Sequence, residues 1–217
     1  MRKKAFVTIL AGFIALSMAA CGNQVTPSAK QGSSSTSPAA EASYKTRFQS
    51  TVFVGDSITE GLSFHDVLDK ANVSAGAGAT AEFALENVDD VVQRNPKHII
   101  IQLGSTDILW PTDDPLAHSY KHYAKLIDNF KEKLPETKIT ILSVTPVTAE
   151  AEKKEPRYQV INDYNEGLQE LAAEKKVAFV DLSPIFVNSL NLYDKDGIHF
   201  NENYYKLLLD FLKDHVN

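Results

Sequence analysis

The chain has 217 residues, of which 43% are hydrophobic, and a formal net charge of −6 at pH 7. This is enough length and apolar material for one folded domain with a real core. An acidic chain without a basic stripe is a poor candidate for binding nucleic acid or for inserting among anionic lipid headgroups through its own surface. We therefore expect no nucleic-acid partner, and a monomer.

The first twenty residues have the pattern of a signal peptide. Residues 1–4 are basic, and residues 5–20 form an apolar run that ends at Cys21. An ordinary membrane span needs roughly 20 apolar residues, so this run is too short to be one. Cys21 is the only cysteine, so it forms no internal disulfide, and it stands where a bacterial lipobox carries its lipidated cysteine. We expect a signal peptide at 1–20 and a lipid anchor at Cys21, on the extracytoplasmic face of the cell membrane. Alternatively, Cys21 is only a small residue near a cleavage site.

Residues 21–45 are the predicted tether. From residue 22 to about residue 42 the chain consists mostly of Ser, Thr, Ala, Pro, Gln and Gly. Such a segment cannot bury enough surface to offset the entropy lost on ordering. We expect it to remain flexible with a mean reach of roughly 25 Å, and we expect the folded domain at 46–217.

The remaining chain alternates between strand-like and helical patterns. We predict strands at 52–54, 72–75, 97–103, 138–144 and 177–181, and helices at 59–69, 80–94, 118–134, 156–175 and 201–214. Residues 98–103 are nearly all apolar, as in a central parallel strand that is covered on both faces. Strands that alternate with helices predict an α/β fold with a doubly wound, five-stranded parallel sheet.

Ser57 is the candidate nucleophile. The first predicted strand ends at Gly55, Asp56 and Ser57. A small turn-forming residue at a strand end directs the next side chain into the crevice at the carboxyl edge of the sheet. A serine there attacks only if a base takes its proton. The alternative is an ordinary helix-capping turn, with Asp56 or Ser57 as N-cap.

Asp196 and His199 are the candidate orienting acid and base. They lie three residues apart, just before the last predicted helix. In a turn or helix entry both side chains can face the same way, so that the carboxylate holds the imidazole and the imidazole reaches Ser57. The alternative is an ordinary loop closed by a capped helix.

Two further turns follow the second and third predicted strands. The first, residues 76–80, is either a turn with Thr80 as helix N-cap or a place where a glycine N–H approaches a substrate oxygen. The second, residues 104–111, contains Asp107, which we expect to bind backbone groups and stiffen the turn. It also contains Trp110, the only tryptophan, which either walls the site or plugs the sheet edge.

Four stretches together resemble the four sequence blocks of the SGNH hydrolases, also called GDSL esterases and lipases. They are residues 55–57, 76–80, 104–107 and 196–199. The resemblance covers residues 51–214. It implies a flavodoxin-like, three-layer α/β/α sandwich and the hydrolysis of ester or thioester bonds without a metal or other cofactor. It assigns Ser57, Asp196 and His199 to catalysis and Gly78 to the oxyanion hole. Thr106 stands where the family usually has an asparagine whose amide helps to hold the oxyanion.

The sequence therefore predicts an exported, lipid-anchored serine esterase. Backbone N–H groups of Ser57 and Gly78, with the hydroxyl of Thr106 as a further donor, would hold the oxyanion. Short acyl esters, cell-wall O-acetyl groups and lysophospholipids are all candidate substrates. The alternative is a catalytically silent cell-envelope binding lipoprotein with the same fold.

His118 and His122 form an i, i+4 pair. Such a pair can clamp a metal from one helix face, but no cysteine or acidic cluster lies nearby in the sequence. We expect a solvated helix face and no metal site.

Overall fold

The computed structural model describes residues 44–187 and 191–215. The predicted signal peptide, Cys21 and the predicted tether up to residue 43 lie outside these ranges. Tyr44, which we placed in the tether, is only 4% exposed and packs in the core. The folded domain therefore starts at least two residues before the predicted boundary at residue 46. Over the described ranges, no helix has the length and apolar character that crossing a membrane requires.

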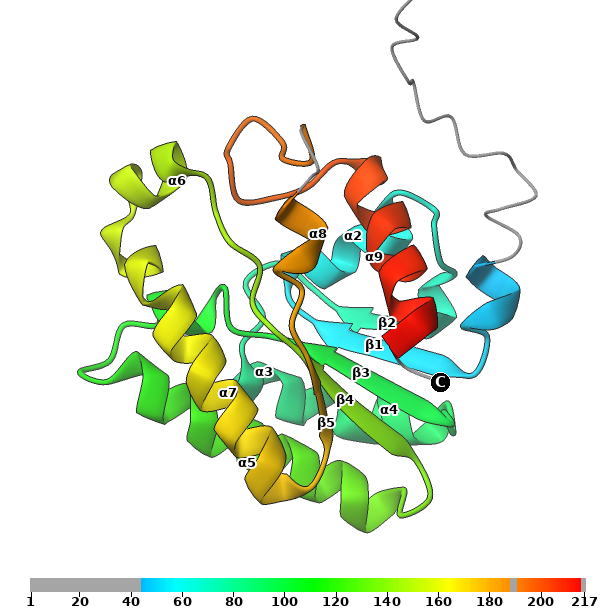
Figure 1. Cartoon of the computed structure of the whole chain (residues 1–217). Coiled ribbons are helices and arrows are strands. Elements are labelled where there is room, and N and C mark those ends of the chain that lie inside the picture. The colour runs from blue at the N-terminus through cyan, green and yellow to red at the C-terminus, as the bar shows by residue number, and fades with distance from the viewer. Residues whose placement is uncertain (1–43, 188–190, 216–217) are drawn as a thin grey trace, which may run out of the picture. The chain divides into compact units, whose positions relative to one another are not determined.

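Five parallel strands form one sheet in the order β2-β1-β3-β4-β5 (Figure 1). The strands are β1 (Thr51–Gly55), β2 (Val73–Ala75), β3 (His98–Gln102), β4 (Lys138–Leu142) and β5 (Ala178–Val180). This is the flavodoxin-like order, in which ligands bind outside the carboxyl ends of the strands where β1 adjoins β3. The predicted five-stranded parallel sheet is confirmed.

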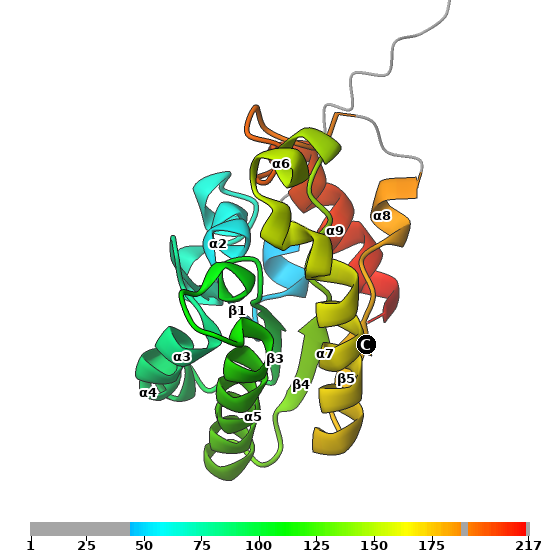
Figure 2. The same ribbon diagram turned by 90° about the vertical axis from the view of Figure 1, so that its left-hand side faces the viewer.

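Helices cover both faces of the sheet (Figures 1 and 2). One face carries α3 (Ala81–Ala84), α4 (Val88–Gln93), α5 (Pro115–Lys133) and α7 (Ile161–Lys175), and the other carries α2 (Ser57–Phe64), α8 (Pro184–Val187) and α9 (Glu202–His215). Successive strand side chains point to opposite faces. Val52 and Val54 therefore pack in the first core, and Phe53 packs in the second. The predicted three-layer α/β/α sandwich is confirmed.

Several predicted helices differ in their bounds. The single helix predicted at 80–94 is divided by the 3₁₀ turn η2 (Leu85–Asn87). The predicted helix at 156–175 begins as the 3₁₀ helix η4 (Pro156–Val160). α2 ends at Phe64 because Asp66 adopts a positive φ of 55°. α8 and α6 (Ala149–Lys154) were not predicted, since they are too short to show a helical period.

Candidate active site

The turn from β1 into α2 positions Ser57. A Cβ atom on Gly55 would lie 2.0 Å from Thr59 Oγ1 and 2.5 Å from the carbonyl oxygen of Gln102, so only glycine fits where β1, β3 and α2 meet. Asp56 is the N-cap of α2, and its Oδ1 accepts a hydrogen bond from the backbone N–H of Ile58 at 2.9 Å. Ser57 is the first residue of the helix. The capping interpretation therefore describes Asp56 and leaves the Ser57 hydroxyl free for another partner.

The structure brings Ser57, His199 and Asp196 together. Ser57 Oγ lies 2.8 Å from His199 Nε2, and His199 Nδ1 lies 2.6 Å from Asp196 Oδ2. The other carboxylate oxygen, Oδ1, accepts hydrogen bonds from the backbone N–H groups of Ile198 and His199, both at 2.9 Å. One oxygen is thus held by the backbone while the other holds the imidazole ring. The three side chains therefore form a continuous path of contacts, in the order that the predicted nucleophile, base and orienting acid require.

The surroundings of Asp196 keep it ionised. Partial burial raises the pKa of this carboxyl, but hydrogen bonds from the His199 ring and from two backbone N–H groups outweigh it, so the pKa lies below the ordinary value. An ionised carboxylate stabilises a protonated imidazole beside it.

A short hairpin, residues 193–200, carries both Asp196 and His199. Within it the backbone N–H of Asp194 donates to the carbonyl of His199 at 2.8 Å. Gly197 has a φ of 74°, and a Cβ atom there would lie 2.1 Å from Thr148 Oγ1. The N–H of Thr148 donates to the carbonyl of Gly197 at 2.9 Å. The hairpin is therefore anchored to the loop that follows β4, and its tight turn requires glycine.

Ser57 and His199 line a hollow of about 390 Å³. The other lining residues are Glu60, Gly61, Phe64, His65, Asp194, Phe200 and Tyr205. Phe64 is 82% exposed, and its ring meets the His65 ring edge-on at 5.1 Å between centroids. The hollow is thus small, open to solvent, and rimmed by an aromatic ring and two acidic residues.

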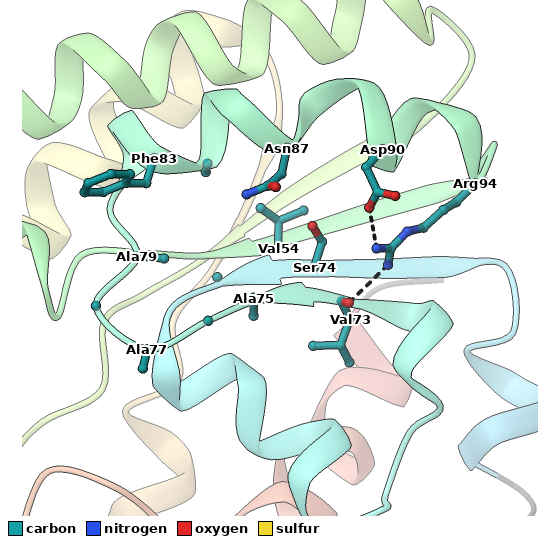
Figure 3. Close-up of a pocket in the computed structure, with 14 residues that line it drawn as sticks. Val54, Val73, Ser74, Ala75, Ala77, Ala79, Phe83, Asn87, Asp90 and Arg94 are labelled. Carbon is teal, nitrogen blue, oxygen red and sulfur yellow. Dashed lines mark hydrogen bonds and ion pairs between the residues drawn. The ribbon is translucent and has the colours of Figure 1, made fainter.

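Gly78 lines a separate hollow of about 470 Å³ at the end of β2 (Figure 3). The turn that carries it is closed by a hydrogen bond of 3.1 Å from the N–H of Ala79 to the carbonyl of Gly76. Gly78 has a φ of 75°, and a Cβ atom there would meet nothing within 4 Å. Its place in the oxyanion hole stays a prediction, because Ser57 and His199 line the other hollow.

Asp107 anchors the segment that follows Gly78. Its Oδ1 accepts a hydrogen bond from the backbone N–H of Ala81 at 3.0 Å and another from Ser119 Oγ at 2.6 Å. Thr80 caps α3 through a bond of 3.3 Å from the N–H of Phe83. Asp107 therefore binds a backbone group, as predicted, but this group belongs to Ala81 and not to the turn of residues 104–111, so that Asp107 links the start of α3 to α5.

Sequence reasoning missed the pairing of Asp56 with Ser105. Ser105 Oγ donates to Asp56 Oδ2 at 2.6 Å, and both residues are buried. Burial raises the pKa of Asp56 to about 6, against the opposing effect of hydrogen bonds from Ser105 and Ile58. The pair joins the turns after β1 and β3, which are neighbouring strands. The signal in the sequence was that a polar residue stands close after each strand end, with Asp56 directly after β1 and Ser105 three positions after the end of β3.

Thr106 follows Ser105 and is half-buried. It precedes the 3₁₀ helix η3 (Asp107–Leu109), and its side chain makes no capping hydrogen bond to that helix. The hydroxyl is therefore available to another partner. Its oxyanion role stays a prediction.

The prediction of a solvated helix face at His118 and His122 is wrong for His122. This residue is only 9% exposed, and its Nε2 lies 3.6 Å from Glu82 Oε1. His118 Nε2 lies 3.0 Å from Glu82 Oε2. Glu82 belongs to α3 and the histidines to α5, so spacing along one helix could not reveal the contact. Trp110 stacks on His118 at 6.4 Å and meets Phe83 edge-on at 5.7 Å, so it packs over these helices and is not among the residues lining the Ser57 hollow.

The model of the GDSL-like lipase/acylhydrolase family matches residues 53–207. This match spans more than half of the chain and includes Ser57, Asp196 and His199. The chain therefore belongs to the GDSL-like lipase/acylhydrolase family, a family of ester-hydrolysing enzymes, and the resemblance to the SGNH hydrolases is confirmed.

Solved structures show the same fold. A GDSL-like lipase from Bacteroides thetaiotaomicron is 21% identical, with a TM-score of 0.62, and the match covers 81% of this chain and 97% of that one. A G-D-S-L family lipolytic protein from Veillonella parvula is 20% identical, with a TM-score of 0.58 and coverage of 76% and 97%. A variant of an acetyl-xylooligosaccharide esterase from Geobacillus stearmophilus is 17% identical, with a TM-score of 0.56 and coverage of 77% and 94%.

One curated relative also matches. It is an N-acylneuraminate cytidylyltransferase from Escherichia coli, 31% identical over 115 residues, which is 51% of this chain. The chain spans 26% of the length of that relative.

Proposed function

We propose that this protein is a serine esterase that cleaves carboxylic esters through an acyl-enzyme intermediate. The observation that carries the proposal is the continuous path of contacts from Ser57 Oγ through His199 to Asp196, at 2.8 and 2.6 Å. Both distances are within hydrogen-bonding range, so a proton can pass from the hydroxyl to a ring that the carboxylate already orients.

In the first half of the reaction, Ser57 Oγ attacks the ester carbonyl carbon while His199 Nε2 takes its proton. The oxyanion forms beside the N-terminus of α2, where the N–H of Ser57 is one of the donors without a partner inside the helix. The N–H of Gly78 and the hydroxyl of Thr106 would complete the hole. His199 then donates its proton to the leaving alcohol, and the acyl group remains on Ser57.

In the second half, water takes the place of the alcohol. His199 removes a proton from the water as its oxygen attacks the acyl carbon, and then returns that proton to Ser57 Oγ. Asp196 stabilises the imidazolium in both halves because its carboxylate stays ionised. The acid leaves and the free enzyme is restored.

The hollow beside Ser57 favours short acyl groups on a neutral polymer. Its volume of about 390 Å³ is near the lower end of the range for ligand sites, roughly 300–1,000 Å³. Glu60 and Asp194 line it and would repel a phosphate headgroup, which disfavours lysophospholipids. The exposed ring of Phe64 offers a flat apolar surface on which a sugar ring can pack. We therefore favour O-acetyl groups on a cell-wall polysaccharide, in keeping with the acetyl-xylooligosaccharide esterase among the similar structures.

The proposed location rests on the sequence alone. A lipid on Cys21 would hold the enzyme at the membrane, and a tether of residues 21–43 would let it reach polymer in the adjacent wall. Replacing Cys21 with alanine should release the protein from membranes or leave it as an uncleaved precursor. An unlipidated mature N-terminus downstream of Cys21, found by mass spectrometry, would contradict the anchor.

The test of function is hydrolysis by the Ser57→Ala variant. We expect the wild type to release acetate from acetylated polysaccharide and to cleave short chromogenic esters faster than long ones, and Ser57→Ala to lose turnover by roughly 10³-fold or more. Ser63→Ala is the matched control, since Ser63 lies on the same helix and donates to the carbonyl of Glu60. Turnover that survives in Ser57→Ala would contradict the proposal. A wild type without turnover on any ester would favour the silent binding protein.

A further inference from the structure

Glu82, His118 and His122 form a compact group on the α3 and α5 side of the sheet. One ligand atom from each residue lies within 4.8 Å of the others. The two helices pack side by side, as both views show (Figures 1 and 2). Two imidazoles and a carboxylate are a ligand set that proteins use to bind zinc.

The distances suit a metal ion placed between these side chains. Two ligand atoms about 2.1 Å from a tetrahedral Zn²⁺ lie roughly 3.4 Å apart. Glu82 Oε2 lies 3.0 Å from His118 Nε2, and the other carboxylate oxygen, Oε1, lies 3.6 Å from His122 Nε2. An ion could therefore replace the direct contacts with only small side-chain movements.

The tautomer of His122 leaves its Nε2 atom ready to bind. His122 Nδ1 lies 2.8 Å from the backbone carbonyl of His118. Because a carbonyl only accepts, Nδ1 must carry the hydrogen, and a neutral ring then has its lone pair on Nε2, facing Glu82. Histidine ligands of metals commonly donate their other ring N–H to a backbone carbonyl in this way. The 9% exposure of His122 restricts the competition from water.

Aromatic rings flank the group. The rings of His118 and His122 lie 4.3 Å apart between centroids, and Trp110 stacks on His118. Two nitrogen ligands disfavour Mg²⁺ and Ca²⁺, which prefer oxygen donors throughout. Zn²⁺ accepts this mixture and would keep a water as its fourth ligand.

We infer that Glu82, His118 and His122 bind one Zn²⁺ ion, and that the ion links α3 to α5. The site shares no residue with Ser57, Asp196 or His199, so it is independent of the proposed hydrolysis. Ala81 and Ser119 are the two residues that donate hydrogen bonds to Asp107. Glu82 directly follows Ala81 in the sequence, and His118 directly precedes Ser119. A bound ion would therefore add a second link beside the one that Asp107 already makes and would stabilise the start of α3.

Calorimetric titration of metal-stripped full-length protein tests the site. All samples carry Cys21→Ser, which removes the only thiol. We expect one Zn²⁺ per chain, and a rise in Tm of about 5–10 °C when free zinc is 100 times its Kd. The fluorescence of Trp110, the only tryptophan, should be quenched when Cu²⁺ or Ni²⁺ occupies the same ligands, because both ions suit imidazole nitrogen.

Variants decide whether these three side chains are the ligands. Glu82→Gln and His118→Gln, at the more exposed positions, should each weaken zinc binding by about 100-fold or more without preventing folding. His215→Gln is the matched control, because His215 lies at the exposed end of α9 and, among the described residues, belongs to no group of side chains that could hold a metal ion. We expect it to bind zinc as the wild type does. No zinc binding by the wild type, or equal binding by Glu82→Gln and His118→Gln, would overturn the inference.

Discussion

The nucleophile and the base are held in place by two different means. Ser57 follows a turn packed between β1, β3 and α2, in which Asp56 is 2% exposed. His199 and Asp196 sit on the hairpin of residues 193–200, with side chains that are 42% and 46% exposed. The first turn is positioned by close packing of the core. The hairpin is packed in the core through Phe200, which is 1% exposed, while its turn, which carries Asp196, is held by backbone hydrogen bonds and by the contact of Gly197 with Thr148.

Because of this difference, we expect substitutions in the first turn to lower stability and substitutions in the turn of the hairpin to lower activity. Damage to a packed turn at the centre of the sheet should destabilise the whole domain, because core atoms there have no room to move. Damage to the turn of the hairpin, around Asp196, should displace the imidazole while leaving the core intact, because local opening of a surface segment costs less than global unfolding. Substitutions in the two regions should therefore differ in whether stability or kcat falls.

Replacing Asp196 with asparagine should lower kcat by about 10³- to 10⁴-fold, because the ring loses both its orientation and the charge that stabilises its protonated form. Thermal unfolding should change little, since the Asp196 side chain is 46% exposed. Steady-state kinetics on a short ester and a melting curve measure the two effects. Lys195→Gln, at an exposed residue of the same hairpin, is the control, and equal losses of kcat in both variants would contradict the assigned role.

Alanine at Gly55 and at Gly197 should have opposite signatures. At Gly55 the new Cβ meets Thr59 and the Gln102 backbone, so we expect a loss of about 1–3 kcal/mol in stability. At Gly197 the Cβ meets Thr148 Oγ1 and the φ is positive, so we expect the hairpin to shift and kcat to fall by roughly 10². Adding Thr148→Ala should restore part of that kcat. If Gly197→Ala lowers Tm as much as Gly55→Ala, the separation of the two regions is wrong.

Asp56 should impose a pH dependence on stability. Its pKa is about 6 in the folded chain against an ordinary 3.8, so between these values the folded state holds a proton that the unfolded state has lost. Stability contributed by this group is therefore present below pH 4 and is lost as the pH rises through 6, by about 3 kcal/mol at most. Urea unfolding of wild type and Asp56→Asn at pH 4 to 7 measures the difference. If the unfolding free energies of the two proteins change with pH in the same way, burial does not raise the pKa of Asp56.

Thr106→Val should have the smallest effect. It keeps the shape of the side chain and deletes the hydroxyl, so we expect the turnover number to fall by roughly tenfold if that hydroxyl donates to the oxyanion. Thr106→Asn should preserve or raise activity on small esters. Kinetics for Thr106→Val that match the wild type would show that the threonine is only structural, and Ser105 would then be the nearest alternative donor.

The sheet and the residues of the proposed triad could be predicted because their signals are local. Apolar runs such as residues 98–103 predict central strands, and the Ser57 turn and the Asp196–His199 pair are short motifs at predicted strand and helix ends. Contacts between distant segments could not be predicted. Ser105 is 49 positions from Asp56, and Glu82 is 36 positions from His118. The exposure of Phe64 could not be predicted either, because it depends on where α2 ends and on how α9 packs beside that helix.

The serine that reacts with a fluorophosphonate probe, once mapped, tests the proposed triad directly. These reagents phosphonylate only a serine whose proton is taken by a neighbouring base. We predict one adduct per chain, located by peptide mass spectrometry on Ser57, and strongly reduced in Asp196→Asn but not in Lys195→Gln. An adduct on a different serine, or ester turnover without any adduct on Ser57, would contradict the central claim that Ser57, His199 and Asp196 carry out the reaction.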